Sequence, residues 1–306
     1  MSRFVQQQDI GDPLVLGVVR REEPHAGPGQ VRIRVRAAGL NPVDWKIAVY
    51  PELAGRFGVV APTGFGNDYA GVVDEVGEGV DGYAVGDRVY GGARGRALAD
   101  HVVVTVGEEI LERTPAGVDD DVAAALPIAA RTAAAAVSAA GVGDGDTVLV
   151  GGAAGGVGVF VVQLALSAGA TVVATASPAN HEFLRGLGAN PLPYGSGLAE
   201  RVRELAPGGI DAAIDLQGTE TAEAALSIGV SPSRVATIAA GPNPPGGAIA
   251  TGGGDAGPEA LPRIASAIAE GALTVPIQQR YPLERLDEAV AVLRDGHVRG
   301  KLVVTL

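Results

Sequence analysis

The spacing of hydrophobic residues divides the chain into two regions. Up to about residue 115, the segment Gln30–Arg36 shows the alternation that a half-buried β-strand requires, because Val31, Ile33 and Val35 alternate with arginines. Apolar or alternating runs predict further strands at Leu14–Val19, Ala70–Val76 and Asp100–Thr105. The first region is therefore predicted to be rich in β-structure.

From about residue 118 the pattern changes to helices that alternate with short apolar strands. Asp119–Ala140 is alanine-rich and predicts a helix broken at Pro127. Apolar runs of strand length follow at Thr147–Val150, Thr171–Ala174, Asp211–Asp215 and Val235–Ala239. This alternation predicts an α/β fold with a doubly wound parallel sheet. The remaining pattern predicts helix, strand, helix and strand at Pro258–Ala269, Val275–Tyr281, Leu283–Leu293 and Lys301–Leu306.

The segment between the first two apolar strands, Gly151–Gly158, has five glycines in eight positions. A helical pattern follows and ends at Gly169. A tight turn that opens onto a helix leaves backbone N–H groups free for an anion, and the expected ligand is a dinucleotide pyrophosphate. The GxGxxG fingerprint begins with alanine here, and a purely structural turn is the alternative. The candidate contacts are Ala153, Gly155, Gly156, Val157 and Gly158.

The end of the second strand of this unit indicates which dinucleotide binds. An NAD site usually has an acid about 20 residues after the turn to bind the ribose 2′-hydroxyl. Thr175–His181 contains no acid, so a 2′-phosphate would meet no repulsion and NADP is favoured. Ser177, Asn180 and His181 can donate hydrogen bonds to that phosphate. The nearest cation is Arg185, and a helix start capped by Ser177 is the alternative.

Later strand ends supply further candidate cofactor contacts, because ligands bind at the carboxyl edge of such sheets. These candidates are Leu216, Ala239 and Ala240. The loop Ala240–Pro258, rich in Gly and Pro, either contacts the cofactor or forms a hinge.

The composition narrows the class of protein. The 306 residues suffice for two domains, and 47% of them are hydrophobic. A net charge of −12 argues against nucleic acid and anionic membrane surfaces as partners. The chain has no cysteine, no apolar leader and no long uninterrupted apolar run, so we expect a cytoplasmic protein without a membrane span.

Several motifs follow one another along the chain, and their order and spacing can be compared with those of known families: Asn41–Lys46, Gly66–Val73, Val85–Val89, Ala125–Pro127, Gly152–Gly158 and Gly296–Val303. On these motifs, essentially the whole chain resembles a zinc-independent medium-chain dehydrogenase/reductase of the quinone oxidoreductase (ζ-crystallin-like) branch. The resemblance implies a GroES-like β-barrel catalytic domain at residues 1–117 and 261–306. It also implies a Rossmann NADP-binding domain at 118–260, a nucleotide in the cleft between the domains, and a homodimer.

Zinc-binding branches of that family need cysteine, histidine and acidic ligands. This chain has no cysteine and four widely spaced histidines, so no tetrahedral ligand set can be assembled and we expect no metal. Asn41 stands near the position of a zinc-binding relative's cysteine. Without a Lewis acid, the easier acceptors are already electrophilic. We therefore expect NADPH to give a hydride to a quinone or other α,β-unsaturated carbonyl compound.

The resemblance also suggests catalytic residues in the first domain. Tyr50 follows the Asn41–Lys46 motif and is the candidate hydrogen-bond donor to the substrate oxygen, or else a packing tyrosine. Asn41 and Asp44 correspond to a polar pair near the nicotinamide ribose, or else to a turn and a helix start. Asp68 is expected to hold a buried turn.

Two more candidates for cofactor contact come from the resemblance. Thr132 would face the phosphates from the helix before the glycine-rich turn, or else merely fill that helix. Lys301, one of two lysines, would approach the cofactor, or else be a solvated charge at the start of a strand.

Two other functions remain open. One is an enoyl reductase acting on a thioester or natural-product intermediate, for which Arg94 and Arg96 could form a basic surface at the mouth of the site. The other is a non-catalytic NADPH-binding sensor or structural protein, since a fold alone does not imply activity.

Overall fold

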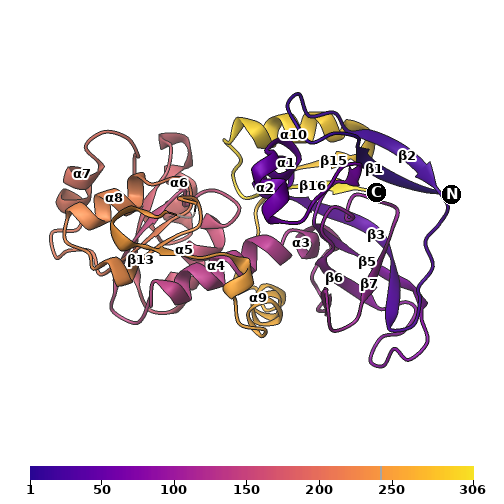
Figure 1. Ribbon diagram of the computed structural model, residues 1–306. Coiled ribbons are helices and arrows are strands. Elements are labelled where there is room, and N and C mark those ends of the chain that lie inside the picture. The colour runs from indigo at the N-terminus through magenta and orange to yellow at the C-terminus, as the bar shows by residue number, and fades with distance from the viewer. Residues whose placement is uncertain (242) are drawn as a thin grey trace. The chain divides into compact units, whose positions relative to one another are not determined.

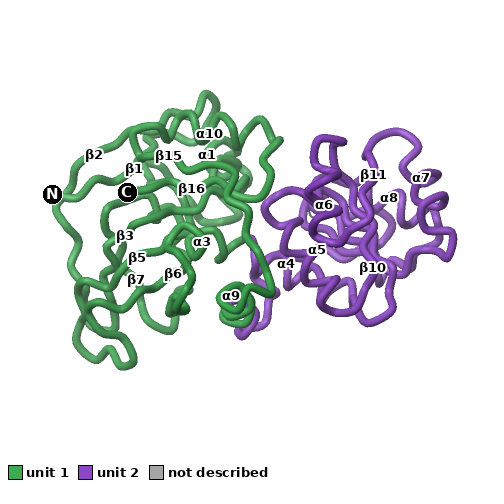
Figure 2. Tube along the Cα trace, turned by 180° about the vertical axis from the view of Figure 1, so that it is seen from behind, with its two compact units in different colours: residues 1–128, 262–306 green, residues 129–261 purple. Residues whose placement is uncertain are grey.

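The computed structural model describes residues 1–241 and 243–306 (Figure 1). The chain forms two compact units (Figure 2). Unit 1 contains residues 1–128 and 262–306, and unit 2 contains residues 129–261.

Unit 2 is built on a six-stranded sheet in which every neighbouring pair is parallel. The strands are β9 (Thr147–Gly151), β10 (Thr171–Thr175), β11 (Asn190–Leu192), β12 (Ala212–Asp215), β13 (Val235–Thr237) and β14 (Ile249–Ala250). Their order is β11-β10-β9-β12-β13-β14. The chain therefore winds outward from β9 in both directions, which confirms the predicted doubly wound parallel sheet.

The helices of unit 2 follow the strands as the sequence pattern predicts. They are α5 (Gly158–Ser167), α6 (His181–Gly186), α7 (Leu198–Leu205) and α8 (Glu220–Ser227). Helices α4 (Pro127–Ala139) and α9 (Ala260–Ala269) lie at the boundaries of the unit. The loop Ala240–Pro258 contains β14, which the sequence analysis did not predict because two residues are too short to form a visible apolar run.

Unit 1 contains a seven-stranded sheet and a three-stranded sheet. The larger sheet has β15 (Ile277–Pro282), β16 (Lys301–Thr305), β3 (Gln30–Leu40), β5 (Asp68–Val76), β6 (Arg88–Gly92) and β8 (Ile110–Arg113) in spatial order, and β7 (His101–Thr105) pairs with β3. The smaller has β2 (Gly17–Arg21), β1 (Ser2–Gln7) and β4 (Thr63–Gly64). The helices are α1 (Pro42–Val49), α2 (Pro51–Arg56), α3 (Asp120–Ala124) and α10 (Leu286–Asp295).

Strand β3 is the centre of unit 1. Val31, Ile33 and Val35 are buried as their alternation predicts. Its last residues pair with β16, so the C-terminal segment, yellow in Figure 1, lies beside a strand from the N-terminal part of the chain. Gly39 allows this region to pack tightly, because a Cβ there would lie 2.1 Å from the carbonyl oxygen of Ala124 on α3.

Several predicted boundaries differ from the observed ones. The predicted helix Asp119–Ala140 is confirmed as α3 and α4, which are separated just before Pro127. The predicted strand Leu14–Val19 is shifted, because β2 begins only at Gly17. The predicted helix Leu283–Leu293 begins with a 3-10 turn and becomes α10 at Leu286.

Candidate functional site

The glycine-rich turn connects β9 to α5 in unit 2. Gly152 has a φ of +67°, a conformation that residues with side chains rarely adopt. A Cβ on Gly158 would lie 2.3 Å from the carbonyl oxygen of Gly152, so only glycine lets α5 begin this close to the turn. Helix α5 has no side-chain cap, and the N–H groups of Val159 and Phe160 already donate to backbone carbonyl oxygens. Among the described residues, the turn N–H groups of Gly156, Val157 and Gly158 have no such partner and can meet an anion. The bare backbone of this turn fits a dinucleotide pyrophosphate.

The three residues predicted to bind a 2′-phosphate follow β10. Ser177, Asn180 and His181 are half-buried, and Asn180 Nδ2 lies 3.4 Å from Ser177 Oγ. His181 Nε2 lies 3.1 Å from the carbonyl oxygen of Ala176. A carbonyl only accepts, so Nε2 carries the proton of that bond and His181 could donate to a phosphate only through Nδ1 of the protonated ring.

The ends of β12 and β13 are held by polar side chains that the sequence analysis missed. Asp215 is buried and accepts hydrogen bonds from the N–H groups of Gln217, Gly218 and Ala222, each at 3.0 Å. These bonds shape the turn that carries the candidate Leu216. The signal in the sequence is an acid at the end of an apolar strand, followed by glycine three residues later.

Thr237 has a similar role at the end of β13. Its Oγ1 accepts hydrogen bonds at 3.2 Å from the N–H groups of Ala239 and Ala240, the two candidate contacts there. Thr132 on α4 is 7% exposed, and a Cβ on Gly253 would lie 3.1 Å from its Oγ1. The loop after β13 therefore packs against Thr132.

A second group of candidates forms a buried polar cluster in unit 1. Asn41, Asp44, Asp68 and Lys301 are each at most 4% exposed. Asp44 lies in the first turn of α1, and its Oδ2 accepts the N–H of Asn41 at 2.7 Å, which caps that helix. The Asn41 side chain donates to Asp68 Oδ2 at 2.8 Å and accepts a bond from Lys301 Nζ. Lys301 Nζ also donates to the carbonyl oxygen of Leu40 at 2.8 Å.

Burial sets the ionisation of this cluster. Removal from water raises the pKa of Asp44 to about 7, and the negative charge of Asp68 adds to the effect. Burial lowers the pKa of Lys301 below its ordinary value, although Asp68 and Asp44 oppose that change. The cluster therefore has a carboxyl group that can gain or lose a proton near neutral pH.

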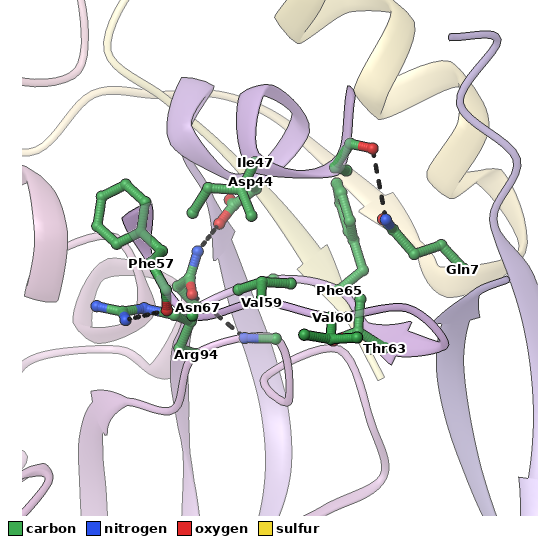
Figure 3. Close-up of a pocket in the computed structure, with 15 residues that line it drawn as sticks. Gln7, Asp44, Ile47, Phe57, Val59, Val60, Thr63, Phe65, Asn67 and Arg94 are labelled. Atoms are coloured by element: carbon green, nitrogen blue, oxygen red, sulfur yellow. Dashed lines mark hydrogen bonds between the residues drawn. The ribbon is translucent and has the colours of Figure 1, made fainter. Parts of the chain in front are cut away.

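Asp44 also faces a pocket of about 340 Å³ in unit 1 (Figure 3). Asn67 donates a hydrogen bond from Nδ2 to Asp44 Oδ1, and both side chains lie on the pocket wall. Most other side chains that line the pocket are apolar, among them Ile47, Val59 and Phe65. Asn67 is not among the site residues predicted from the sequence, although it belongs to the motif Gly66–Val73.

Tyr50 is placed differently from Asn41 and Asp44. It connects α1 to α2, is 51% exposed, and its ring centroid lies 6.0 Å from that of Trp45. It is absent from the described residues that line the pocket. The structure thus groups Asn41, Asp44 and Lys301 in one cluster of unit 1, leaves Tyr50 near its surface, and collects the remaining candidates in unit 2.

The residues present do not fit a zinc site. The chain has no cysteine, and within residues 1–241 and 243–306 no three acidic or histidine side chains are grouped to hold a metal ion. The amide of Asn41 is engaged by Asp68 and Lys301. In the same described ranges, no helix has both the length and the apolar character needed to cross a membrane.

Comparison with protein families gives two matches. Residues 27–116 match the alcohol dehydrogenase GroES-like domain, and residues 187–304 match the family described as zinc-binding dehydrogenase. The chloroplast envelope quinone oxidoreductase homolog of Arabidopsis thaliana is 32% identical over 92% of this chain and 91% of that protein. An NADPH-dependent alkenal/one oxidoreductase of the same plant is 32% identical over 92% of this chain and 73% of that protein.

Other relatives are much longer proteins. Erythronolide synthase EryA2 of Saccharopolyspora erythraea is 35% identical over 61% of this chain, but the match covers 5% of that protein. Among solved structures, the quinone oxidoreductase from Coxiella burnetii has a TM-score of 0.86 at 29% identity, covering 100% of this chain and 99% of that one. The CurK enoyl reductase has a TM-score of 0.87 at 25% identity and covers 99% of both chains.

Proposed function

Because the chain belongs to the medium-chain dehydrogenase/reductase family, in its quinone oxidoreductase branch, we propose that it is a zinc-independent, NADPH-dependent reductase of quinones or other α,β-unsaturated carbonyl compounds. Two features support this function together. Unit 2 has a glycine turn with no acid in the segment Thr175–His181, and unit 1 has a pocket lined by both apolar and polar side chains.

The cofactor is proposed to bind along the carboxyl edge of the parallel sheet in unit 2. The pyrophosphate would be held by the turn residues Ala153, Gly155, Gly156, Val157 and Gly158. The 2′-phosphate would be bound by Ser177, Asn180 and His181. The preference for NADPH over NADH rests on the absence of acid from Thr175 to His181 and on the NADPH dependence of the Arabidopsis alkenal/one oxidoreductase.

The protein's own residues would bind and orient the acceptor. Reduced nicotinamide, when bound, would supply the hydride for an electrophilic carbon of the acceptor. Ile47, Val59 and Phe65 would hold the carbon skeleton and exclude water. The resemblance assigns the hydrogen bond to the developing oxyanion to the hydroxyl of Tyr50, although Tyr50 does not line this pocket, and a proton from water completes the reduced product.

The buried cluster has a positioning role in this proposal. Asp44 receives the bond from Asn67 at the pocket wall, while Lys301 and Asp68 fix Asn41 behind it. The observation that carries the proposed function is this connection, because it places a carboxyl group with a pKa of about 7 on the wall of a cavity that Ile47, Val59 and Phe65 also line.

The test is the loss of reduced-nicotinamide absorbance with purified protein and a panel of quinones and enones. Consumption of NADPH with at least one acceptor, and much slower consumption of NADH, supports the proposal. Tight NADPH binding without consumption in any mixture would instead favour the non-catalytic nucleotide-binding protein.

A second candidate function is an enoyl reductase on a thioester intermediate. It is favoured by the similarity to the CurK enoyl reductase over 99% of both chains. Crotonyl-CoA and a simple quinone distinguish the two functions. Turnover of crotonyl-CoA without turnover of any quinone or simple enone would replace the first proposal by the second.

The family also leads us to propose a homodimer that works in the cytoplasm. The absence of cysteine is compatible with a reducing compartment. Sedimentation equilibrium at several concentrations tests the assembly, since a dimer has twice the chain mass of 30.6 kDa.

A further inference from the structure

The pocket in unit 1 has a basic side chain among its lining residues. Arg94 follows β6 and lies on the pocket wall beside Phe57 and Asn67 (Figure 3). Arg94 Nη1 donates to the carbonyl oxygen of Phe57 at 3.2 Å, and its guanidinium carbon lies 4.7 Å from the centre of the Phe57 ring. A ring contact of this kind holds a guanidinium group in place without neutralising its charge.

The backbone on both sides of Arg94 is also held in place. Ala93 N–H donates to the carbonyl oxygen of Asn67 at 2.7 Å, and Gly95 N–H donates to Asn67 Oδ1 at 3.3 Å. Asn67 is itself bonded to Asp44. The position of Arg94 is therefore fixed relative to the polar end of the pocket, so the guanidinium does not need to be ordered by a ligand.

Arg94 differs from the neighbouring Arg96 in its charge pairing. Arg96 is bonded to Glu109 and to the carbonyl oxygen of Val103. In the part of the chain that the structure describes, no carboxylate lies within 4.0 Å of the guanidinium nitrogens of Arg94, and one of its five N–H donors is used. In a chain with a net charge of −12, a cation left unpaired on a pocket wall is an electrostatic feature that a ligand can use.

Asp44 is the opposing charge on the same pocket wall. Its two oxygens accept bonds from Asn67 and from the backbone of Asn41, so both point at donors. Burial raises its pKa to about 7, which reduces its negative charge near neutral pH. Arg94 therefore dominates the charge that a small anion meets in this pocket.

We propose that Arg94 binds an anionic group of the acceptor, so that the preferred substrates are small α,β-unsaturated carbonyl compounds that carry a carboxylate. The inference rests on the proposed reductase function and adds the class of substrate. The apolar part of a cavity of about 340 Å³ accommodates a small carbon skeleton, and a guanidinium group can hold both oxygens of a carboxylate.

The experiment compares trans-3-acetylacrylate with its uncharged methyl ester, which has the same enone. We expect kcat/KM of the wild-type protein to favour the anion by about tenfold or more, the range of a hydrogen-bonded charge pair. Arg94→Gln should remove this preference, and Arg94→Lys should keep part of it because the positive charge remains. Arg56→Gln is the matched control, since Arg56 on α2 next to Phe57 is exposed like Arg94 but does not line the pocket.

The inference is overturned if Arg94→Gln prefers the anion over the methyl ester as strongly as wild type does. It is also overturned if Arg56→Gln loses this preference to the same extent as Arg94→Gln. Crotonyl-CoA distinguishes a substrate carboxylate from the phosphates of a carrier as the anion that Arg94 binds. If Arg94→Gln slows the turnover of crotonyl-CoA alone, Arg94 binds the carrier's phosphates and the carboxylate proposal is wrong. Circular dichroism melting of Arg94→Gln and Arg94→Lys shows whether each variant folds.

Binding provides a test that does not depend on turnover. Calorimetry with saturated 4-oxopentanoate should show about tenfold weaker binding to Arg94→Gln than to wild type, and no change in Arg56→Gln. If this holds while no acceptor is reduced, the anion site stands and the reductase function fails. If neutral enones are reduced but Arg94→Gln binds 4-oxopentanoate as tightly as wild type, the reductase function stands and the substrate inference fails.

Discussion

Lys301 Nζ donates a hydrogen bond to the side-chain oxygen of Asn41, although the two residues are 260 positions apart. The register of β16 against β3, in which Leu302 pairs with Leu40, creates this contact. Lys301, which the sequence predicts to contact the cofactor, is thus buried within unit 1 and holds Asn41 in the polar cluster.

Replacing Lys301 by Met should destabilise unit 1 by on the order of 3 kcal/mol, because removing a buried charged donor leaves its hydrogen-bond acceptors buried without a partner. Asn41 Oδ1 and the Leu40 carbonyl would lose their donor. Urea denaturation measures the free energy of unfolding. Lys46→Met is the control, since the only other lysine is exposed and should change stability by less than about 1 kcal/mol.

Asp44→Asn should alter the pH dependence of stability. The folded-state pKa of Asp44 is raised to about 7 from 3.8, so its contribution is fully present below pH 3.8 and is lost as the pH rises through 7. The free energy of unfolding of wild type relative to Asp44→Asn should therefore fall between about pH 4 and pH 7, with a limiting slope of about 1.4 kcal/mol per pH unit. A constant difference over this window would show that Asp44 is not buried in its neutral form.

Gly158→Ala should weaken NADPH binding by at least about tenfold, because the added Cβ would meet the Gly152 carbonyl and displace the turn. Fluorescence titration measures the affinity. Gly186→Ala on α6 is the control, as a Cβ there has nothing within 4 Å. Unchanged NADPH affinity in Gly158→Ala would refute this turn as the pyrophosphate site.

Tyr50→Phe should lower kcat for a quinone or enone by on the order of tenfold and leave the Kd for NADPH unchanged, since the variant loses only a hydroxyl group. Steady-state kinetics and NADPH titration separate the two effects. Tyr83→Phe is the control, because the Tyr83 hydroxyl donates to the Leu111 carbonyl oxygen at 2.8 Å and has no proposed role in turnover. If both constants match wild type, Tyr50 is a packing residue.

The parallel sheet of unit 2 could be predicted because its strands are continuous apolar runs and its first turn needs glycine. Unit 1 was harder, because β3 contains register shifts at Arg32/Ile33 and at Val35/Ala37 that simple alternation does not show. Helix α2 was not predicted, and α1 was predicted only as an alternative, a helix start at Asp44, since each helix is short and begins at a proline.

The polar cluster could be predicted only in part. Asn41 and Asp44 are neighbours in sequence, and the capping contact between them is local. Asn67 reaches Asp44 from 23 residues away, and Asp68 lies near Asn41 because Gly39 pairs with Asp68 across β3 and β5. Such contacts depend on strand register, which the pattern of side chains along one strand does not specify.

The pairing of β16 with β3 also determines the order in which a nascent chain can assemble. Residues 301–305 are synthesised about 260 residues after the end of β3, a delay of roughly 13–50 s at ordinary rates of translation. The continuous sequence of unit 2 leaves the ribosome within that interval, while the edge of β3 at Ala37–Leu40 still lacks its partner. An open edge of this kind is a site for wrong pairing. In newly made chains this edge therefore stays open until Lys301 arrives and the polar cluster closes.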